Sequence, residues 1–291
     1  MSNSDLIQVR RDWNGPRPPV SVVILTLNEE SNMADCLDSC AWCDDVHVLD
    51  SGSKDRTMEI SRRRGAKTYF NNFESFGKQR NWAIDNTSLR HDWVFHLDAD
   101  ERFTPGIIRE MDALLKTSPT QAGFYVRSKL IFMGRWLKWT AGYPTYQVRL
   151  SHRKRMRFQD YGHGQREDTE NVGKLHESYL HYNFSHGPDD WFDRHNRYST
   201  KEAAQGLEEM DRMPPLPHLF GGDRVRRRRW LKAFSYRLPL RGPLMTFYTM
   251  FVQLGFLDGA PGWHYVRMRS IYQSMIDVKM AVLRQEGRVK R

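Results

Sequence analysis

Residues 20–30 read VSVVILTLNEE, an apolar, β-branched run that leads into an asparagine and two glutamates. A run of this length and composition is typical of a strand buried on both faces of a parallel sheet. Similar runs at 46–50 and 93–97 end at or directly before an aspartate, Asp50 and Asp98. The sequence therefore predicts a parallel sheet with acidic groups at the ends of its strands.

The segments between these runs have helical spacing of apolar residues. We expect helices over 29–42, 54–64, 76–86 and from about 105 to 116, with a further strand at 66–70. Strands that alternate with helices indicate βαβ units and a doubly wound α/β fold. Ligands of such sheets bind at the carboxyl ends of the strands, so we expect the acidic groups there to converge on one cleft.

Three regions differ in composition. Residues 1–19 are polar and proline-rich, which predicts an N-terminal arm. Residues 20–187 hold the predicted sheet, with mixed strands and binding loops over 121–182. Residues 188–291 are basic and amphipathic, which predicts a helical C-terminal extension with helices at 189–210 and 263–285.

The chain has 291 residues, a net charge of +10, and three cysteines, all within 36–43. So few cysteines exclude a disulfide framework, and with an N-terminus that lacks a signal-peptide core they favour a cytosolic protein.

The cysteine spacing, C-x3-C-x2-C, matches that of the iron–sulfur loop of radical SAM enzymes. However, the segment continues an amphipathic helix, so we expect these side chains to pack in the core.

The triplet Asp98-Ala-Asp100 follows a predicted strand directly. Carboxylate oxygens are the ligands that Mg²⁺ and Mn²⁺ prefer. A metal ion held by such a loop would also bind a diphosphate. The alternative is a solvated acidic turn.

Four segments, 20–30, 50–57, 77–81 and 96–101, resemble in this order the motifs of family 2 glycosyltransferases with the GT-A fold. The resemblance covers about residues 19–185. Within that family the sequence is similar to bacterial enzymes that add sugars to the lipopolysaccharide core, a likeness supported by Gly255-Phe-Leu-Asp-Gly259. It implies a GT-A sheet flanked by helices, and an inverting transfer from a nucleotide-sugar donor, UDP-linked, with Mg²⁺ or Mn²⁺.

The resemblance also implies roles for single residues. Asp100 would bind the metal, with His181 or His186 as a further ligand, of which we take His181. For Lys78 and Arg80, the alternative interpretation is that they are ordinary charged residues on the surface of a helix. The residues that would line the nucleotide-sugar site are Thr26, Asn28, Glu29, Asp50, Gly52, Lys78, Arg80 and Asp98.

The segment 161–168, YGHGQRED, is polar and glycine-flanked and follows the sheet region. Sugar transfer needs a base for the acceptor hydroxyl, and relatives have an acidic residue here. We expect Glu167 to be this base, with Asp168 and His163 as open alternatives. A solvated acidic loop is the competing interpretation.

The run Arg226–Arg229 precedes an aromatic stretch, and the uncharged residues 243–257 are too few to span a bilayer. This pattern predicts a peripheral element on an anionic membrane surface, the cytoplasmic face of the inner membrane, where a glycolipid acceptor would lie. The alternative is a basic helix pair packed on the catalytic domain. No nucleic-acid partner is expected, because no recognition motif surrounds the basic run.

The sequence leaves the sugar, the acceptor hydroxyl and the oligomeric state open. A polyprenyl-phosphate sugar transferase would share the same site residues. A noncatalytic module that binds nucleotide sugars or polyanions is a further alternative, which donor turnover would exclude.

Overall fold

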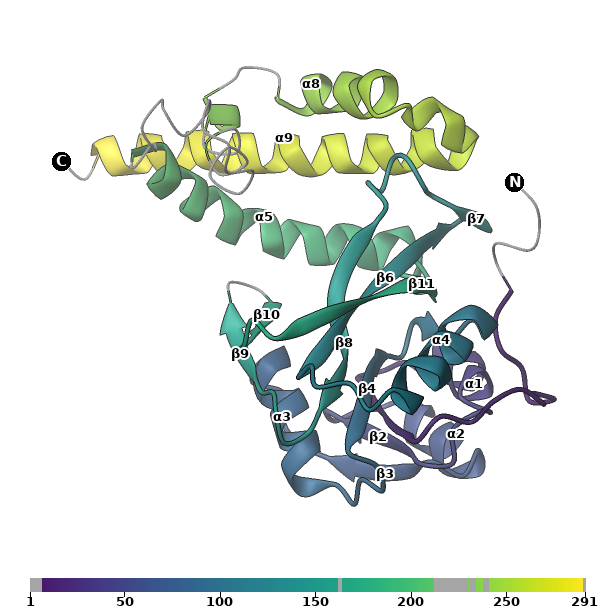
Figure 1. Ribbon diagram of the computed structural model, residues 1–291. Helices are drawn as coiled ribbons and strands as arrows, with labels where there is room; N and C mark the ends of the chain where they lie inside the picture. The colour runs from purple at the N-terminus through teal and green to yellow at the C-terminus, as the bar shows by residue number, and fades with distance from the viewer. Residues whose placement is uncertain (1–6, 162–163, 212–229, 231–233, 238–240, 290–291) are drawn as a thin grey trace. The chain divides into compact units, whose positions relative to one another are not determined.

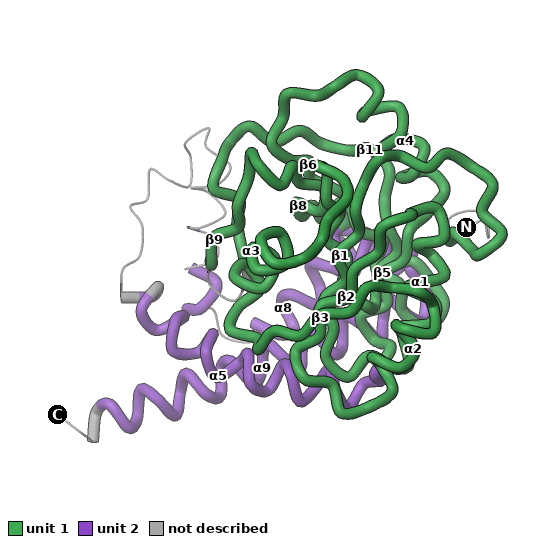
Figure 2. Tube along the Cα trace, turned by 90° about the horizontal axis from the view of Figure 1, so that it is seen from below, with its two compact units in different colours: residues 1–136, 143–185 green, residues 137–142, 186–291 purple. Residues whose placement is uncertain are grey.

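The computed structural model describes residues 7–161, 164–211, 230, 234–237 and 241–289 (Figure 1). They form two compact units: unit 1 holds residues 1–136 and 143–185, and unit 2 holds 137–142 and 186–291 (Figure 2). His163 and the basic run 226–229 lie outside the described residues.

Unit 1 is built on one mixed sheet. Its strands β3, β2, β1 and β4 are parallel, β8 is antiparallel to both β4 and β6, and β11 is parallel to β6 and antiparallel to β5. The order across the sheet is β3 (Lys67–Phe70), β2 (Val46–Asp50), β1 (Val20–Thr26), β4 (Trp93–Asp98), β8 (Thr145–His152), β6 (Gly123–Phe132), β11 (Val172–His181) and β5 (Glu101–Arg102). A short strand, β7 (Arg135–Trp136), pairs with β6, and β9 (Phe158–Tyr161) with β10 (Gly164–Glu167) forms a separate hairpin.

Strand β1 is buried on both faces, as its composition predicts. Val22 and Ile24 belong to the core cluster that also holds Met33, whereas Val23 belongs to a second cluster with Ala83. Helices therefore flank the sheet on both sides: α1 (Glu30–Ser39), α2 (Thr57–Arg63) and α4 (Pro105–Lys116) contribute to the first cluster, and α3 (Phe76–Asn86) to the second.

Helix α1 is shorter than the predicted helix 29–42. After Ser39 the chain forms tight turns, in which the amide of Cys40 donates to the Leu37 carbonyl and that of Cys43 to the Cys40 carbonyl, at 3.0 and 2.8 Å. Cys36 and Cys40 are buried in the first core cluster, and burial raises the pKa of the Cys40 thiol. This position agrees with the core-packing interpretation of the cysteines.

The N-terminal arm packs on unit 1 where it is described. Val9 is buried, and its amide donates to the Phe103 carbonyl at 2.9 Å. Trp13 contacts the first core cluster. The arm therefore contributes apolar contacts to the sheet unit.

Unit 2 is helical. Its described elements are α5 (Gly187–Asp211), α8 (Arg241–Phe247), a π-helical turn (Tyr248–Val252), a 3₁₀ turn (Gly255–Asp258) and α9 (Gly259–Val289). None of the described helices has the length and apolar composition needed to cross a membrane.

Asp258 joins a distant segment to these helices. Its buried carboxylate accepts hydrogen bonds from the amides of Lys138, Trp139 and Thr140 at 3.2, 3.0 and 2.7 Å. A Cβ at Gly255 would lie 2.8 Å from the Thr140 methyl group, so a larger residue there would have to displace it. These contacts explain why residues 137–142 group with the C-terminal helices, which sequence order does not reveal.

Candidate active site

The ends of β1 and β2 bring together the first group of predicted site residues. Thr26 and Asp50 are register partners, and the Thr26 hydroxyl donates to Asp50 Oδ1 at 3.1 Å. Asp50 Oδ2 accepts the amide of Gly52 at 3.0 Å. Gly52 has φ +102°, a conformation that glycine adopts without strain. Asp50 is only 3% exposed, and its carboxylate fixes the conformation of this loop through these hydrogen bonds.

Asn28 and Glu29 stabilise the same edge. Asn28, with φ 56°, accepts the Lys54 amide on its side-chain oxygen at 2.8 Å. The Glu29 carboxylate accepts the Asn32 side-chain amide at 2.7 Å. The predicted nucleotide-pocket residues of β1 and β2 therefore lie in one hydrogen-bonded loop cluster.

Asp98 lies on the other side of β1, opposite Leu25 in the register. Its two carboxylate oxygens accept hydrogen bonds from Arg80 at 3.0 Å and from Arg149 at 2.8 Å. Burial raises the pKa of Asp98, but the two guanidinium groups outweigh it and hold the pKa well below its usual range. Asp98 is therefore a carboxylate at neutral pH, with 30% of its side chain exposed.

Arg149 on β8 is a site residue that the sequence analysis missed. Its Nη2 also donates to Glu101, its Nη1 to the His96 carbonyl and its Nε to the Tyr179 hydroxyl. Burial, together with the Asp98 carboxylate, raises the pKa of Glu101 to about 7 despite Arg149. The Asp98 amide donates to Glu101 at 3.0 Å. Arg149 and Glu101 thus fix the conformation of the turn from Asp98 to Glu101 by bonding to its first and last residues.

Asp100 and His181 lie side by side. His181 Nε2 is 3.3 Å from Asp100 Oδ2. The pairing of β11 with β5 places His181 opposite Glu101, the residue that follows Asp100 in the chain. Burial lowers the pKa of His181, but the nearby carboxylates, first of all Asp100, raise it to about 9. His186, the other late histidine, is exposed.

The Asp100 carboxylate supplies the oxygen ligands that Mn²⁺ and Mg²⁺ prefer. His181 would add an imidazole nitrogen only after it releases the proton that the raised pKa favours, so metal binding there would release a proton. Within the described part of the chain, no group of three or more His, Cys, Asp and Glu side chains could hold a metal. A metal at Asp100 and His181 would therefore have two protein ligands and leave positions for phosphate oxygens and water. This arrangement fits a metal that binds together with a nucleotide donor.

A hollow of about 380 Å³ opens beside Asp98. Glu167 lines it, and Glu167 Oε1 accepts a hydrogen bond from the Tyr125 hydroxyl. Asp168 has a different role, because its Oδ1 accepts the Arg157 amide at 2.9 Å. The hollow is lined by Phe76, Arg80, Asp98, Tyr125, Tyr146, Gln147, Val148, Phe158, Gln165, Arg166 and Glu167.

The two predicted cations of α3 have different surroundings. Arg80 is buried and binds Asp98. Lys78 is 63% exposed and pairs with Glu74 at 2.5 Å. Of these two cations, Arg80 lines the hollow.

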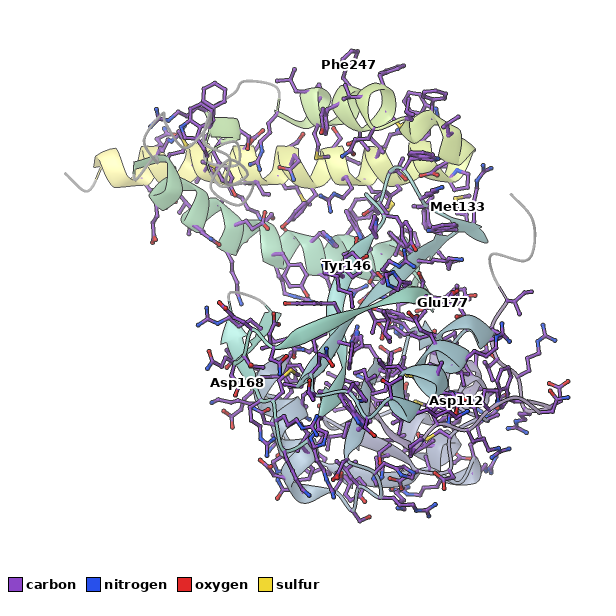
Figure 3. The ribbon with its side chains drawn as sticks, viewed as in Figure 1. Asp112, Met133, Tyr146, Asp168, Glu177 and Phe247 are labelled. Carbon is purple, nitrogen blue, oxygen red and sulfur yellow. The ribbon has the colours of Figure 1, made fainter. Side chains whose placement is uncertain are left out.

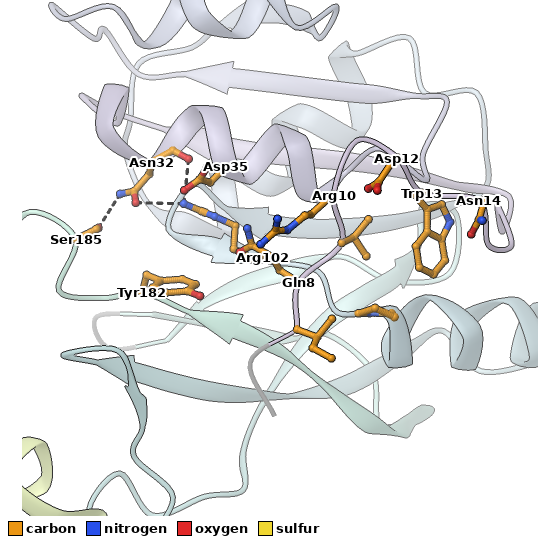
Figure 4. A pocket seen from close by; sticks show the side chains of 13 residues that line it. Gln8, Arg10, Asp12, Trp13, Asn14, Asn32, Asp35, Arg102, Tyr182 and Ser185 are labelled. Carbon is orange, nitrogen blue, oxygen red and sulfur yellow. Dashed lines mark hydrogen bonds between the residues drawn. The ribbon is translucent and has the colours of Figure 1, made fainter. Parts of the chain in front are cut away.

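A larger hollow, about 880 Å³, lies beside the N-terminal arm and holds none of the predicted site residues (Figure 4). Its most buried polar groups bond to each other: Arg102 donates to the Asn32 carbonyl at 3.0 Å, and the Asn32 amide donates to Ser185 at 2.7 Å. These groups are satisfied within the protein.

The sequence pattern of the family described as glycosyl transferase family 2 matches residues 21–171, more than half of the chain. The chain belongs to glycosyl transferase family 2. It therefore has transferase activity on sugars, and its mixed sheet flanked by helices is the GT-A fold that the sequence predicts.

Among its relatives is the lipopolysaccharide core biosynthesis glycosyltransferase LpsC of Rhizobium meliloti (strain 1021), 26% identical over 66% of this chain and 73% of LpsC. An uncharacterized glycosyltransferase of Rickettsia bellii (strain RML369-C) is 27% identical, but the match spans only 40% of this chain and 39% of that protein. The predicted likeness to lipopolysaccharide core enzymes is thus confirmed.

Glucosyl-3-phosphoglycerate synthase of Mycobacterium tuberculosis, crystallised with Mn²⁺, UDP and glucosyl-3-phosphoglycerate, is a structural neighbour of this family 2 enzyme. It is 26% identical and covers 39% of this chain and 44% of its own, with a TM-score of 0.31.

Proposed function

We propose that this family 2 enzyme transfers a sugar, with inversion, from a UDP-linked donor to a lipopolysaccharide-core or other glycolipid acceptor. The acceptor class is supported by the similarity to LpsC. The observation that carries the proposal is the convergence of Asp98, Arg80 and Glu167 on one hollow, with the Asp100–His181 pair two residues beyond Asp98.

The loop cluster of Thr26, Asn28, Glu29, Asp50 and Gly52 would hold the nucleotide. When bound at Asp100 and His181, Mg²⁺ or Mn²⁺ would supply positive charge to the diphosphate leaving group. Carboxyl ends of parallel strands are where such ligands bind in α/β sheets.

Glu167 would remove the proton from the acceptor hydroxyl. Its Oε1 is held by Tyr125, which leaves Oε2 to accept that proton. Attack from the face opposite the leaving group then gives inversion in one displacement. Arg80 and Arg149 would keep Asp98 ionised and fixed beside the donor sugar.

A transfer assay tests this function. Purified enzyme is incubated with a panel of UDP-sugars, Mn²⁺ and a truncated lipopolysaccharide acceptor, and the product is identified by mass spectrometry and its anomeric configuration by NMR. We expect one UDP-sugar to be transferred with inverted configuration. Donor binding without transfer or hydrolysis would instead favour a noncatalytic module.

The Asp100→Ala variant tests the metal role. We expect loss of transfer with the fold retained, because the remaining His181 cannot hold the ion alone. Asp112→Ala is the matched control, since Asp112 is paired with Lys116 on the surface of α4. Undiminished transfer by Asp100→Ala without added metal would exclude the proposed role.

A further inference from the structure

The outer face of α8 and the π-helical turn is apolar and exposed. Leu244, Phe247, Tyr248, Phe251 and Val252 are between 49% and 60% exposed and recur at helical spacing. We call these five residues the apolar ridge. Figure 3 shows Phe247 pointing away from α9. Contiguous exposed apolar side chains of this kind mark interaction surfaces.

The opposite face of the same helices is packed, so the exposure is one-sided. A Cβ at Gly242 would lie 2.9 Å from the Ser270 carbonyl of α9, and Thr249 and Met250 are buried. Apolar exposure continues beyond the ridge at Leu254, Phe256 and Leu257. The ridge is thus the free side of a well-packed helix pair.

An apolar groove of about 630 Å³ lies between α8 and α9. Its lining includes Ile271, Met275 and Val278 together with two cationic residues, Arg267 and Lys279. The Lys279 ammonium is bound by Asn196 on α5, whereas Arg267 is exposed. Apolar side chains beside an exposed cation suit lipid chains beneath anionic headgroups.

The positive charge of the chain is concentrated in the part of the sequence that contains the ridge. Residues 223–291 contain 15 of the 45 Lys and Arg but only four of the 35 Asp and Glu, a net charge of +11. The other 222 residues therefore carry a net charge of −1. No charged residue lies between 243 and 257. This combination favours an anionic bilayer over a neutral protein surface.

We propose that the apolar ridge inserts into the interfacial layer of an anionic phospholipid membrane, with exposed cations of the same unit, such as Arg267, against the headgroups. The element lies on the membrane and does not cross it. This inference rests on the proposed function, because attachment would bring the enzyme to a lipid-linked acceptor. The alternative of a fully packed basic helix pair does not account for the exposed ridge.

Vesicle flotation tests the proposal with the full chain. We expect binding to vesicles of phosphatidylcholine mixed with phosphatidylglycerol and weaker binding to phosphatidylcholine alone. Salt should weaken binding to the anionic vesicles, because it screens the attraction between cationic side chains and anionic headgroups. Phe247→Ser should reduce the partition coefficient about tenfold, and Phe247→Ser with Phe251→Ser about a hundredfold. Phe73→Ser, which removes a similarly exposed aromatic from unit 1, should leave binding unchanged.

Transfer to two acceptors separates this proposal from the proposed function. The ridge variants should lose transfer to acceptor embedded in vesicles and keep transfer to the delipidated core oligosaccharide, which also shows that they are folded. Undiminished vesicle binding by the double variant would overturn the membrane site. So would a dimer that the double variant converts to monomer, because a second copy would then cover the ridge.

Discussion

At the scale of single residues, Arg149 is the clearest case of a buried charge that organises the site. Its guanidinium binds both the buried Glu101 and Asp98, whose side chain is 30% exposed. Removing one member of such a network leaves an uncompensated buried charge.

We therefore expect Arg149→Met to lower the free energy of unfolding by about 3 kcal/mol. Arg153→Met should cost less than about 1 kcal/mol, because Arg153 pairs with the half-exposed Asp92. Urea denaturation measures both. Equal losses in the two variants would mean that Arg149 has no special role in the network.

The neighbouring residues Glu167 and Asp168 differ in role: Glu167 is the candidate base, whereas Asp168 accepts a structural hydrogen bond. Glu167 lines the hollow beside Asp98, whereas Asp168 accepts the Arg157 amide. We expect Glu167→Gln to reduce kcat about 10²- to 10⁴-fold with little change in donor KM. Asp168→Asn should keep most of its kcat. A larger loss in Asp168→Asn, measured in the same assay, would reverse the assignment.

At the scale of elements, Asp45 joins the amino-terminal ends of several strands. Its carboxylate accepts the Ser21 hydroxyl at 2.6 Å and the Lys67 ammonium at 2.8 Å, and it lies 3.0 Å from His47. Burial raises the pKa of Asp45, but these donors outweigh it and lower the pKa. Burial lowers the pKa of His47.

A lowered carboxyl pKa stabilises the fold above the unfolded pKa, near 4, and this stabilisation is lost as pH falls toward the folded pKa. The wild type should therefore exceed Asp45→Asn in unfolding free energy by a constant amount at neutral pH, and this difference should shrink below about pH 4. Urea titrations over a pH series measure it. Asp85→Asn, at an exposed position, should show no such pH dependence.

Elements with local signals could be predicted from the sequence. The bounds of β2 and α3 match the predicted ones, and β1 begins at the start of the quoted run 20–30. Buried β-branched runs specify the strands, and Ser75 caps the helix. The pairing of β8 with β4 and β6 joins segments far apart in the chain, and no local pattern encodes it. Arg149 was missed for this reason, since within YQVRL it has no feature of a site residue.

At the scale of the whole molecule, the proposed chemistry belongs to unit 1 and the membrane surface to unit 2. All predicted site residues lie within residues 26–181, and the apolar ridge lies within 244–252. Nucleotide binding and vesicle binding are therefore separable by mutation. This separation makes ligand stabilisation a test of the site that does not depend on any acceptor or membrane.

A ligand that binds only the folded state raises stability by mass action, about 2.7 kcal/mol at a concentration of 100 Kd. We expect UDP with Mn²⁺ to raise the melting temperature of the wild type and of Phe247→Ser equally, and UDP with EDTA to do so much less. Asp100→Ala should lose the difference between Mn²⁺ and EDTA, because the ion would lack its carboxylate ligand. Differential scanning fluorimetry measures these shifts, and equal UDP stabilisation with Mn²⁺ and with EDTA in the wild type would contradict a metal shared between Asp100 and the diphosphate.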